Sequence, residues 1–100
     1  IFEHLQILHQ SLILMLMNKM KKYWEKNGVD LDITAQSLRN YIDYVDDYDI
    51  ILMGPQVSYS LDKVKEESNK PVGVIKPVDY GRGNCENIMK MAEELYKELN

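Results

Sequence analysis

Cysteine, histidine, proline and glycine are all scarce among the 100 residues of this sequence. The single cysteine, Cys85, excludes an intrachain disulfide and any metal site built from several cysteines. The two histidines, His4 and His9, leave little from which to build a zinc site. We therefore expect a protein without a metal and without a cofactor.

Long apolar runs are also missing. The longest run, residues 11–17, has only seven residues and is followed by Asn18 and Lys19. A bilayer span needs about 20 apolar residues, and no small-residue cleavage site of a signal peptide follows the run. We expect a cytoplasmic protein that does not insert into a membrane.

The charge balance argues against nucleic acid as a partner. The net charge is −4 and the isoelectric point is about 5.1, so a broad basic surface is not expected. Hydrophobic residues make up 45% of the chain and charged residues 28%, which is typical of a globular protein. The length predicts a single domain over residues 1–100.

Helical and strand patterns alternate along the chain. Leu12, Leu16 and Met20 follow helical spacing, while Lys19, Lys22 and Lys26 lie away from that apolar face. Continuous apolar residues at 50–53 predict a strand buried on both faces. The patterns together predict strands at 2–8, 29–35, 50–53 and 72–75, helices at 12–26, 38–44, 56–68 and 86–99, a polar turn at 46–49 and a loop at 78–84.

This alternation predicts an α/β fold, a single-domain four-stranded parallel sheet flanked by helices on both faces, in a three-layer sandwich of the flavodoxin-like kind. Ligands of open α/β sheets bind at the carboxyl ends of the strands. The loops at 9–11, 34–37, 54–56 and 77–83 are therefore the places to look for a site.

Two short motifs follow predicted strands. Gly54-Pro55-Gln56 combines a breaker pair with an amide that can hydrogen-bond a partner, and Asp79-Tyr80-Gly81 comes after the last strand. Either motif can also be a simple turn.

Three other candidates are weaker. Cys85 stands at the start of a predicted helix, where a thiol pKa can be lowered, but Glu86 beside it opposes that effect. His4 and His9 could carry a phosphoryl group in principle, although a lone histidine near a strand is more often a packing residue or a surface residue. The acidic turn at 46–49 precedes a strand and so lies at the wrong end of the sheet for a metal pocket.

Taken together, the motifs resemble a known family. The stretches are Leu16-Met17-Asn18-Lys19-Met20, Asp49 to Tyr59, Lys70-Pro71-Val72 and Asp79-Tyr80-Gly81. From about Lys19 to Leu99 the chain resembles the enzyme IIB component of the lactose/cellobiose/chitobiose branch of the sugar phosphotransferase system (PTS).

The resemblance implies a phosphoryl relay. In that family a cysteine at the end of the first strand takes a phosphoryl group from a histidine of the IIA partner. It passes the group to a β-glucoside or other disaccharide that the membrane-embedded IIC partner takes up. A loop of the type Cys-Ser-Ala-Gly-Met-Ser-Ser-Ser wraps the phosphoryl oxygens with backbone N–H groups at a helix N-terminus. The resemblance places the docking surface for partners at Gly54, Pro55, Gln56, Tyr59, Asp79, Tyr80 and Gly81, and the protein in the cytoplasm, held near the membrane through IIC.

This sequence departs from the family at the nucleophile. Counting toward the N-terminus without gaps from the matching stretch Leu16-Met17-Asn18-Lys19-Met20 puts the family cysteine at Ile7. The phosphate-loop region then contains Leu8, His9, Gln10 and Ser11, with no cysteine and no glycine through Leu14. The departure is either a local frameshift, because suitable codons in a shifted frame spell Ser-Ser-Ser-Ile here, or genuine divergence.

Three functions follow as alternatives. The chain is a IIB component with a defective active loop, or a catalytically inactive IIB-like module that binds IIA or IIC and regulates sugar uptake. The third is a flavodoxin-like or receiver-like domain. A receiver needs paired carboxylates after the first strand and a lysine near the last. Lys76 is present and the carboxylates are not.

Overall fold

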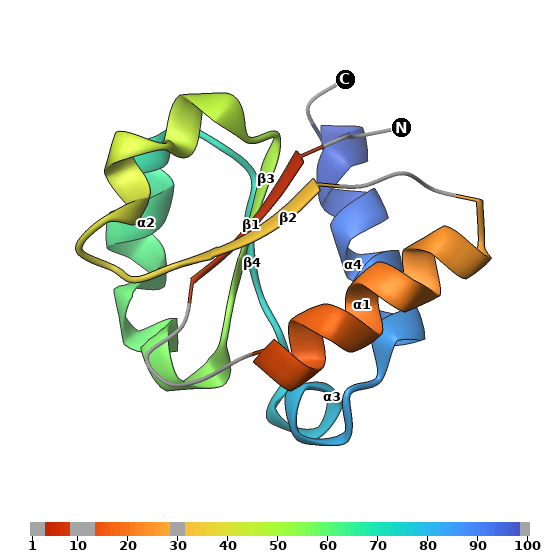
Figure 1. Cartoon of the computed structure of the whole chain (residues 1–100). Coiled ribbons are helices and arrows are strands. Elements are labelled where there is room, and N and C mark those ends of the chain that lie inside the picture. Colours follow the sequence, from red (N-terminus) through yellow and green to blue (C-terminus); the bar gives the residue numbers. More distant parts are fainter. Residues whose placement is uncertain (1–3, 9–13, 29–31, 99–100) are drawn as a thin grey trace.

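The computed structural model describes residues 4–8, 14–28 and 32–98, which form four strands and the helices around them (Figure 1). The strands are β1 (His4–Leu8), β2 (Asp32–Gln36), β3 (Ile50–Met53) and β4 (Val72–Val74). The α-helices are α1 (Leu14–Lys26), α2 (Leu61–Ser68), α3 (Pro77–Arg82) and α4 (Cys85–Glu98). Three 3₁₀ turns complete the described elements, η1 (Tyr41–Asp43), η2 (Val45–Asp47) and η3 (Pro55–Ser60).

The sheet is parallel throughout and has the order β2-β1-β3-β4. Leu8 at the end of β1 is in register with Gln36 of β2 and Met53 of β3, so these three strands end at one edge. The chain moves outward from β1 in one direction to β2 and in the other to β3 and β4. The strand order therefore reverses between β1 and β3, which is where open α/β sheets bind ligands.

Helices α1 and α4 cover one face of the sheet (Figure 1). Met20 and Trp24 of α1 and Ile88 and Ala92 of α4 are at most 1% exposed. They pack on the side chains of Leu5, Ile7, Ile33, Ile50 and Leu52 in one apolar cluster.

The other face carries η1, η2, η3 and α2. Tyr41, Val45, Val57 and Val64 from these elements form a second apolar cluster with Leu8, Ile51, Met53 and Val72. Alternate residues of β1 and β3 thus serve opposite layers, as the two-residue period of a strand requires. The two layers explain why all four residues of β3 are fully buried.

The predicted α/β class, the parallel sheet and the strand at 50–53 are confirmed. Strands β1 and β4 fall within the predicted ranges 2–8 and 72–75, and α4 begins one residue before the predicted 86. Strand β2 extends one residue past the predicted end at 35. The predicted starts of the strand at 29 and of the helix at 12 lie outside the described residues.

The predicted helix at 38–44 is wrong, because this segment forms η1, and η2 follows in place of the predicted polar turn. Gln6 of β1 is fully buried, and its Nε2 donates a hydrogen bond to the Tyr41 carbonyl at 3.2 Å. The same carbonyl accepts the Tyr44 N–H at 3.0 Å, which closes a 3₁₀ turn rather than a helical one. A side chain of the central sheet thus occupies an oxygen that a continuing α-helix would use.

The loop predicted at 78–84 is also wrong, because residues 77–82 form the short helix α3. Pro77 takes the first helical position, where its missing N–H costs nothing. Gly83 then ends the helix with a φ of 64°, the left-handed conformation that glycine adopts readily. The predicted helix at 56–68 likewise begins as η3 and becomes α-helical only at Leu61.

Candidate functional site

The ends of β1 and β3 meet at a small group of residues that we call the strand-end cluster: Leu8, Gly54, Gln56 and Tyr80. The Gly54 N–H donates to the Leu8 carbonyl at 2.8 Å. A Cβ placed on Gly54 would lie 3.1 Å from Gln56 Oε1, 3.3 Å from Tyr80 Cε2 and 3.4 Å from the Leu8 oxygen. The absence of a side chain at Gly54 therefore lets three other segments converge at the point where the strand order reverses.

Tyr80 brings α3 into this cluster. Its hydroxyl is buried, and in the described part of the chain no group hydrogen-bonds to it. Burial raises the pKa of the Tyr80 phenol, so the hydroxyl keeps its proton at neutral pH. The cluster thus holds one buried hydroxyl donor and one amide side chain at the carboxyl edge of the sheet.

The remaining residues of the Gly-Pro-Gln motif shape the turn that leaves β3. Pro55 opens η3, and its carbonyl accepts a hydrogen bond from Ser58 Oγ at 2.9 Å. Tyr59 is 75% exposed, an unusual state for a large aromatic side chain. It therefore points to solvent rather than into the strand-end cluster.

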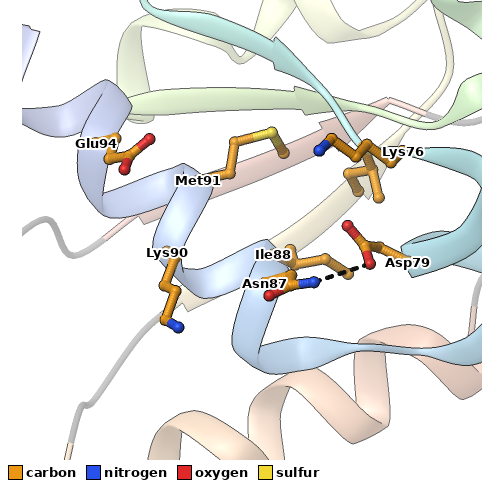
Figure 2. Close-up of a pocket in the computed structure, with 8 residues that line it drawn as sticks. Lys76, Asp79, Asn87, Ile88, Lys90, Met91 and Glu94 are labelled. Atoms are coloured by element: carbon orange, nitrogen blue, oxygen red, sulfur yellow. Dashed lines mark hydrogen bonds between the residues drawn. The ribbon is translucent and has the colours of Figure 1, made fainter.

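Asp79 and Gly81 lie apart from the cluster. Asp79 is 9% exposed, and its Oδ1 accepts a hydrogen bond from Asn87 Nδ2 at 3.1 Å, which ties α3 to α4 (Figure 2). Asp79 and Asn87 line a pocket of about 310 Å³, together with Lys76, Lys90, Met91 and Glu94. Gly81 is exposed, with no atom within 4 Å of the place where its Cβ would be. Of the Asp79-Tyr80-Gly81 motif, only Tyr80 reaches the strand ends.

Ile7, the position expected for the family cysteine, is the last residue but one of β1. Its side chain is fully buried in the cluster beneath α1 and α4 and offers no nucleophile. Leu8, the first of the four phosphate-loop candidates, is the last residue of β1 and is buried on the opposite face. His9, Gln10 and Ser11 lie outside the described residues.

The weaker candidates lie elsewhere. Cys85 opens α4 as predicted, but burial raises its thiol pKa and the nearby Lys19 only partly opposes this. Its Sγ contacts the Gly83 carbonyl at 3.4 Å. His4 begins β1, at the opposite end of the strand from the cluster, and its Nδ1 lies 3.3 Å from Asp32 Oδ2.

Among the described residues, no group of three or more His, Cys, Asp and Glu side chains is placed to hold a metal ion. No described helix is both long enough and apolar enough to cross a membrane.

The fold defines a doubly wound α/β protein, and the strand-end cluster is its candidate site at the carboxyl ends of the central strands. A family model described as "PTS system, Lactose/Cellobiose specific IIB subunit" matches residues 13–91. The chain belongs to this family. The matched range includes Gly54, Gln56 and Tyr80 but begins after Ile7 and Leu8.

Relatives agree with this assignment. The chain is 32% identical over 89 residues to the galactose-specific EIIB component of Lactococcus lactis subsp. cremoris, covering 81% of this chain and 82% of that protein. The same identity and coverage hold for the cellobiose-specific EIIB component of Lactococcus lactis subsp. lactis.

Two solved structures share the fold. The cellobiose-specific IIB component from Borrelia burgdorferi superposes with a TM-score of 0.80 at 21% identity, covering 96% of this chain and 93% of that one. The lactose-specific IIB domain from Streptococcus pneumoniae superposes with a TM-score of 0.73 at 19% identity, covering 95% of this chain and 97% of that one.

Sequence reasoning missed two features. The Asp79–Asn87 bond joins residues on neighbouring helices, and no local pattern announces such a pair. The second feature is a groove between α1 and the start of α4, lined by Lys19, Lys22 and Lys26. The helical spacing of these lysines was visible in the sequence, but the groove they line was not.

Proposed function

We propose that this chain is a IIB component of a phosphotransferase system for a disaccharide of the cellobiose or lactose type, with its phosphoryl relay interrupted in the chain as written. The family match over residues 13–91 carries the proposal. The partners are a phosphohistidine-bearing IIA protein and a membrane-embedded IIC protein that holds the sugar, so the chain acts on the cytoplasmic side of the membrane. Gly54, Pro55, Gln56, Tyr59, Asp79, Tyr80 and Gly81 would form the docking surface.

The chemistry supports an interrupted relay. Phosphoryl transfer through this family's route needs a thiolate that attacks phosphorus and then releases the group to the sugar. Ile7 is a buried hydrocarbon, and residues 7–14 include no glycine to let backbone N–H groups close around a phosphate. Cys85 is no substitute, because it follows a different loop and burial keeps its thiol protonated.

The test is incubation with phosphorylated IIA, followed by intact mass measurement. The unmodified chain should gain no phosphoryl group, and neither should Ile7→Cys, because the rest of the loop still lacks an anion cradle. Replacing residues 7–14 by Cys-Ser-Ala-Gly-Met-Ser-Ser-Ser should add one phosphoryl group. A Cys85→Ser change in that background leaves a single thiol, and alkylating it beforehand should block the transfer. Label on Cys85, His4 or His9 of the unmodified chain would contradict the proposal.

A second candidate is an inactive module that binds IIA or IIC and regulates uptake. The observation in its favour is Tyr59, which presents 75% of its surface to solvent on the turn that leaves the strand-end cluster. Partner binding by the unmodified chain without phosphoryl transfer, weakened by Tyr59→Ala, would favour this module. Absence of any binding of the unmodified chain to IIA or IIC would count against it.

A further inference from the structure

A groove of about 430 Å³ separates α1 from the connection between α3 and α4. Figure 1 shows the two helices α1 and α4 side by side at this place. The groove shares no residue with the strand-end cluster. It is lined by Lys19, Lys22, Tyr23 and Lys26 of α1 and by Gly83, Asn84, Cys85 and Glu86.

Helix α1 has the opposite charge to the rest of the molecule. It carries Lys19, Lys21, Lys22 and Lys26 against the single acid Glu25, a local charge of +3. The whole chain has a net charge of −4, so the residues outside α1 sum to −7. An acidic protein thus presents one basic helix, and three of its four lysines line the same groove.

The charge in the groove is not neutralised internally. Among the described residues that line the groove, Glu86 is the only acid, and its Oε1 pairs with Lys90 Nζ at 3.4 Å. In the part of the chain that the structure describes, Lys19, Lys22 and Lys26 form no ion pair. The Lys19 side chain instead lies over Gly83. Its Nζ is 3.1 Å from the position that a Cβ on Gly83 would take. The ammonium groups are therefore available to an external anion.

We infer that this groove docks an acidic segment of a partner protein. Positions 19, 22 and 26 lie on one side of α1 and span about 10 Å along the helix, at 1.5 Å per residue. An extended peptide rises about 3.3 Å per residue and points alternate side chains to the same side, so roughly five residues place three carboxylates along a comparable distance. Carboxylates along such a segment meet all three lysines, whereas a single small anion meets only one end of the row. Lysine ammonium groups are compact point charges that suit separate carboxylates.

The test is a titration of the intact ¹⁵N-labelled chain with a hexaglutamate peptide, followed by NMR. Amide signals of residues 19–26 and 83–86 should shift saturably, and the dissociation constant should rise with salt because exposed charges are screened. The double change Lys22→Glu with Lys26→Glu should weaken binding about tenfold, the scale expected when two exposed ion pairs turn into repulsions. The control Lys63→Glu with Lys65→Glu alters net charge equally on α2, on the opposite face of the sheet. It should change binding less than about twofold.

Several results would overturn the inference. One is that no amide signal shifts saturably. Another is that both double variants weaken binding equally, which would mean that net charge alone matters. Tighter binding of inorganic phosphate, or of vesicles containing phosphatidylglycerol, with the same signals shifted would assign the groove to another ligand. Concentration-dependent self-association through these residues would assign it to a second copy of the chain. Circular dichroism of both variants ensures that a loss of binding is not a loss of fold.

Discussion

Gly54 is needed for space rather than for backbone freedom. Its φ of −63° and ψ of 154° are allowed for any residue. What a side chain would meet is Gln56, Tyr80 and the Leu8 carbonyl, all within 3.4 Å. The Leu8 oxygen at 3.4 Å is at ordinary van der Waals distance, so the crowding comes from Gln56 Oε1 at 3.1 Å and from the Tyr80 ring at 3.3 Å.

Gly54→Ala should therefore destabilise the protein by about 1–3 kcal/mol, the usual cost of forcing a methyl into a packed site. Urea unfolding measures the change. Gly81→Ala is the matched control, because no atom lies within 4 Å and alanine is favoured over glycine inside a helix. It should be neutral or stabilising by about 0.5–1 kcal/mol. Equal losses from both variants would mean that the crowding at Gly54 is not what matters.

The ionisation of Tyr41 makes the stability of the fold depend on pH in the alkaline range. It is 2% exposed, and its hydroxyl donates to Glu67 Oε1 at 3.0 Å. Burial first, and then the bond to the Glu67 carboxylate and its charge, raise the pKa of Tyr41 to about 12. An unfolded tyrosine has a pKa of about 10.

The contribution of Tyr41 to the free energy of unfolding is therefore fully present below about pH 10 and is lost as the pH rises toward 12. The loss occurs because the tyrosine of the unfolded chain releases its proton at lower pH than that of the folded chain. The loss should approach about 1.4 kcal/mol per pH unit within that window. Urea unfolding at pH 9, 10 and 11 measures it. Tyr41→Phe supplies the reference, since it cannot ionise and should fall less steeply. Identical slopes in the two proteins would show that Tyr41 does not carry the effect.

At the scale of elements, β3 is the strand on which both layers depend. Ile51 and Leu52 are adjacent and fully buried, yet Ile51 packs under α2 and Leu52 under α1 and α4. Truncation of either should leave a cavity that neighbours on the other face cannot fill.

Ile51→Ala and Leu52→Ala should each cost about 2–5 kcal/mol of unfolding free energy. Chemical denaturation gives the values, with Val78→Ala as the control. Val78 is 52% exposed on α3, so its truncation should cost less than about 0.5 kcal/mol. A loss below about 1 kcal/mol at Ile51 or Leu52 would contradict the core described above.

For the molecule as a whole, the two apolar clusters share one sheet. Trp24 is the single tryptophan and lies in the cluster beneath α1 and α4. Because β1 and β3 contribute side chains to both clusters, neither layer should persist without the other. Domains of this size usually unfold in one cooperative step.

Trp24 fluorescence and far-ultraviolet circular dichroism should therefore report the same urea midpoint. The first reports one layer, whereas the second reports every helix and strand. Separate midpoints would mean that the layer containing α2 unfolds independently of the layer containing Trp24.

Much of the fold could be predicted from the sequence, because its signals are local. Four apolar residues in a row, bounded by a polar turn and by Gly54-Pro55, favour a strand buried on both faces, and Ile50–Met53 is that strand. Strands alternating with helical periodicity require parallel pairing, which places Gly54 and Gln56 at the carboxyl edge. Residue 7, where we expect the family cysteine, is an isoleucine, and that too is a matter of residue identity.

Tertiary structure decided what depends on distant partners. The buried Gln6 amide donates to the Tyr41 carbonyl, in a segment that forms 3₁₀ turns in place of the predicted helix. Asp79 turns away from the strand ends to meet Asn87, leaving only Tyr80 of its motif at Gly54. The lysines of α1 follow a visible helical spacing, but only the packing of α1 beside α4 makes them one side of a groove. Each outcome needed a contact between segments remote in sequence, whose hydrogen bonds and excluded volume no local pattern contains.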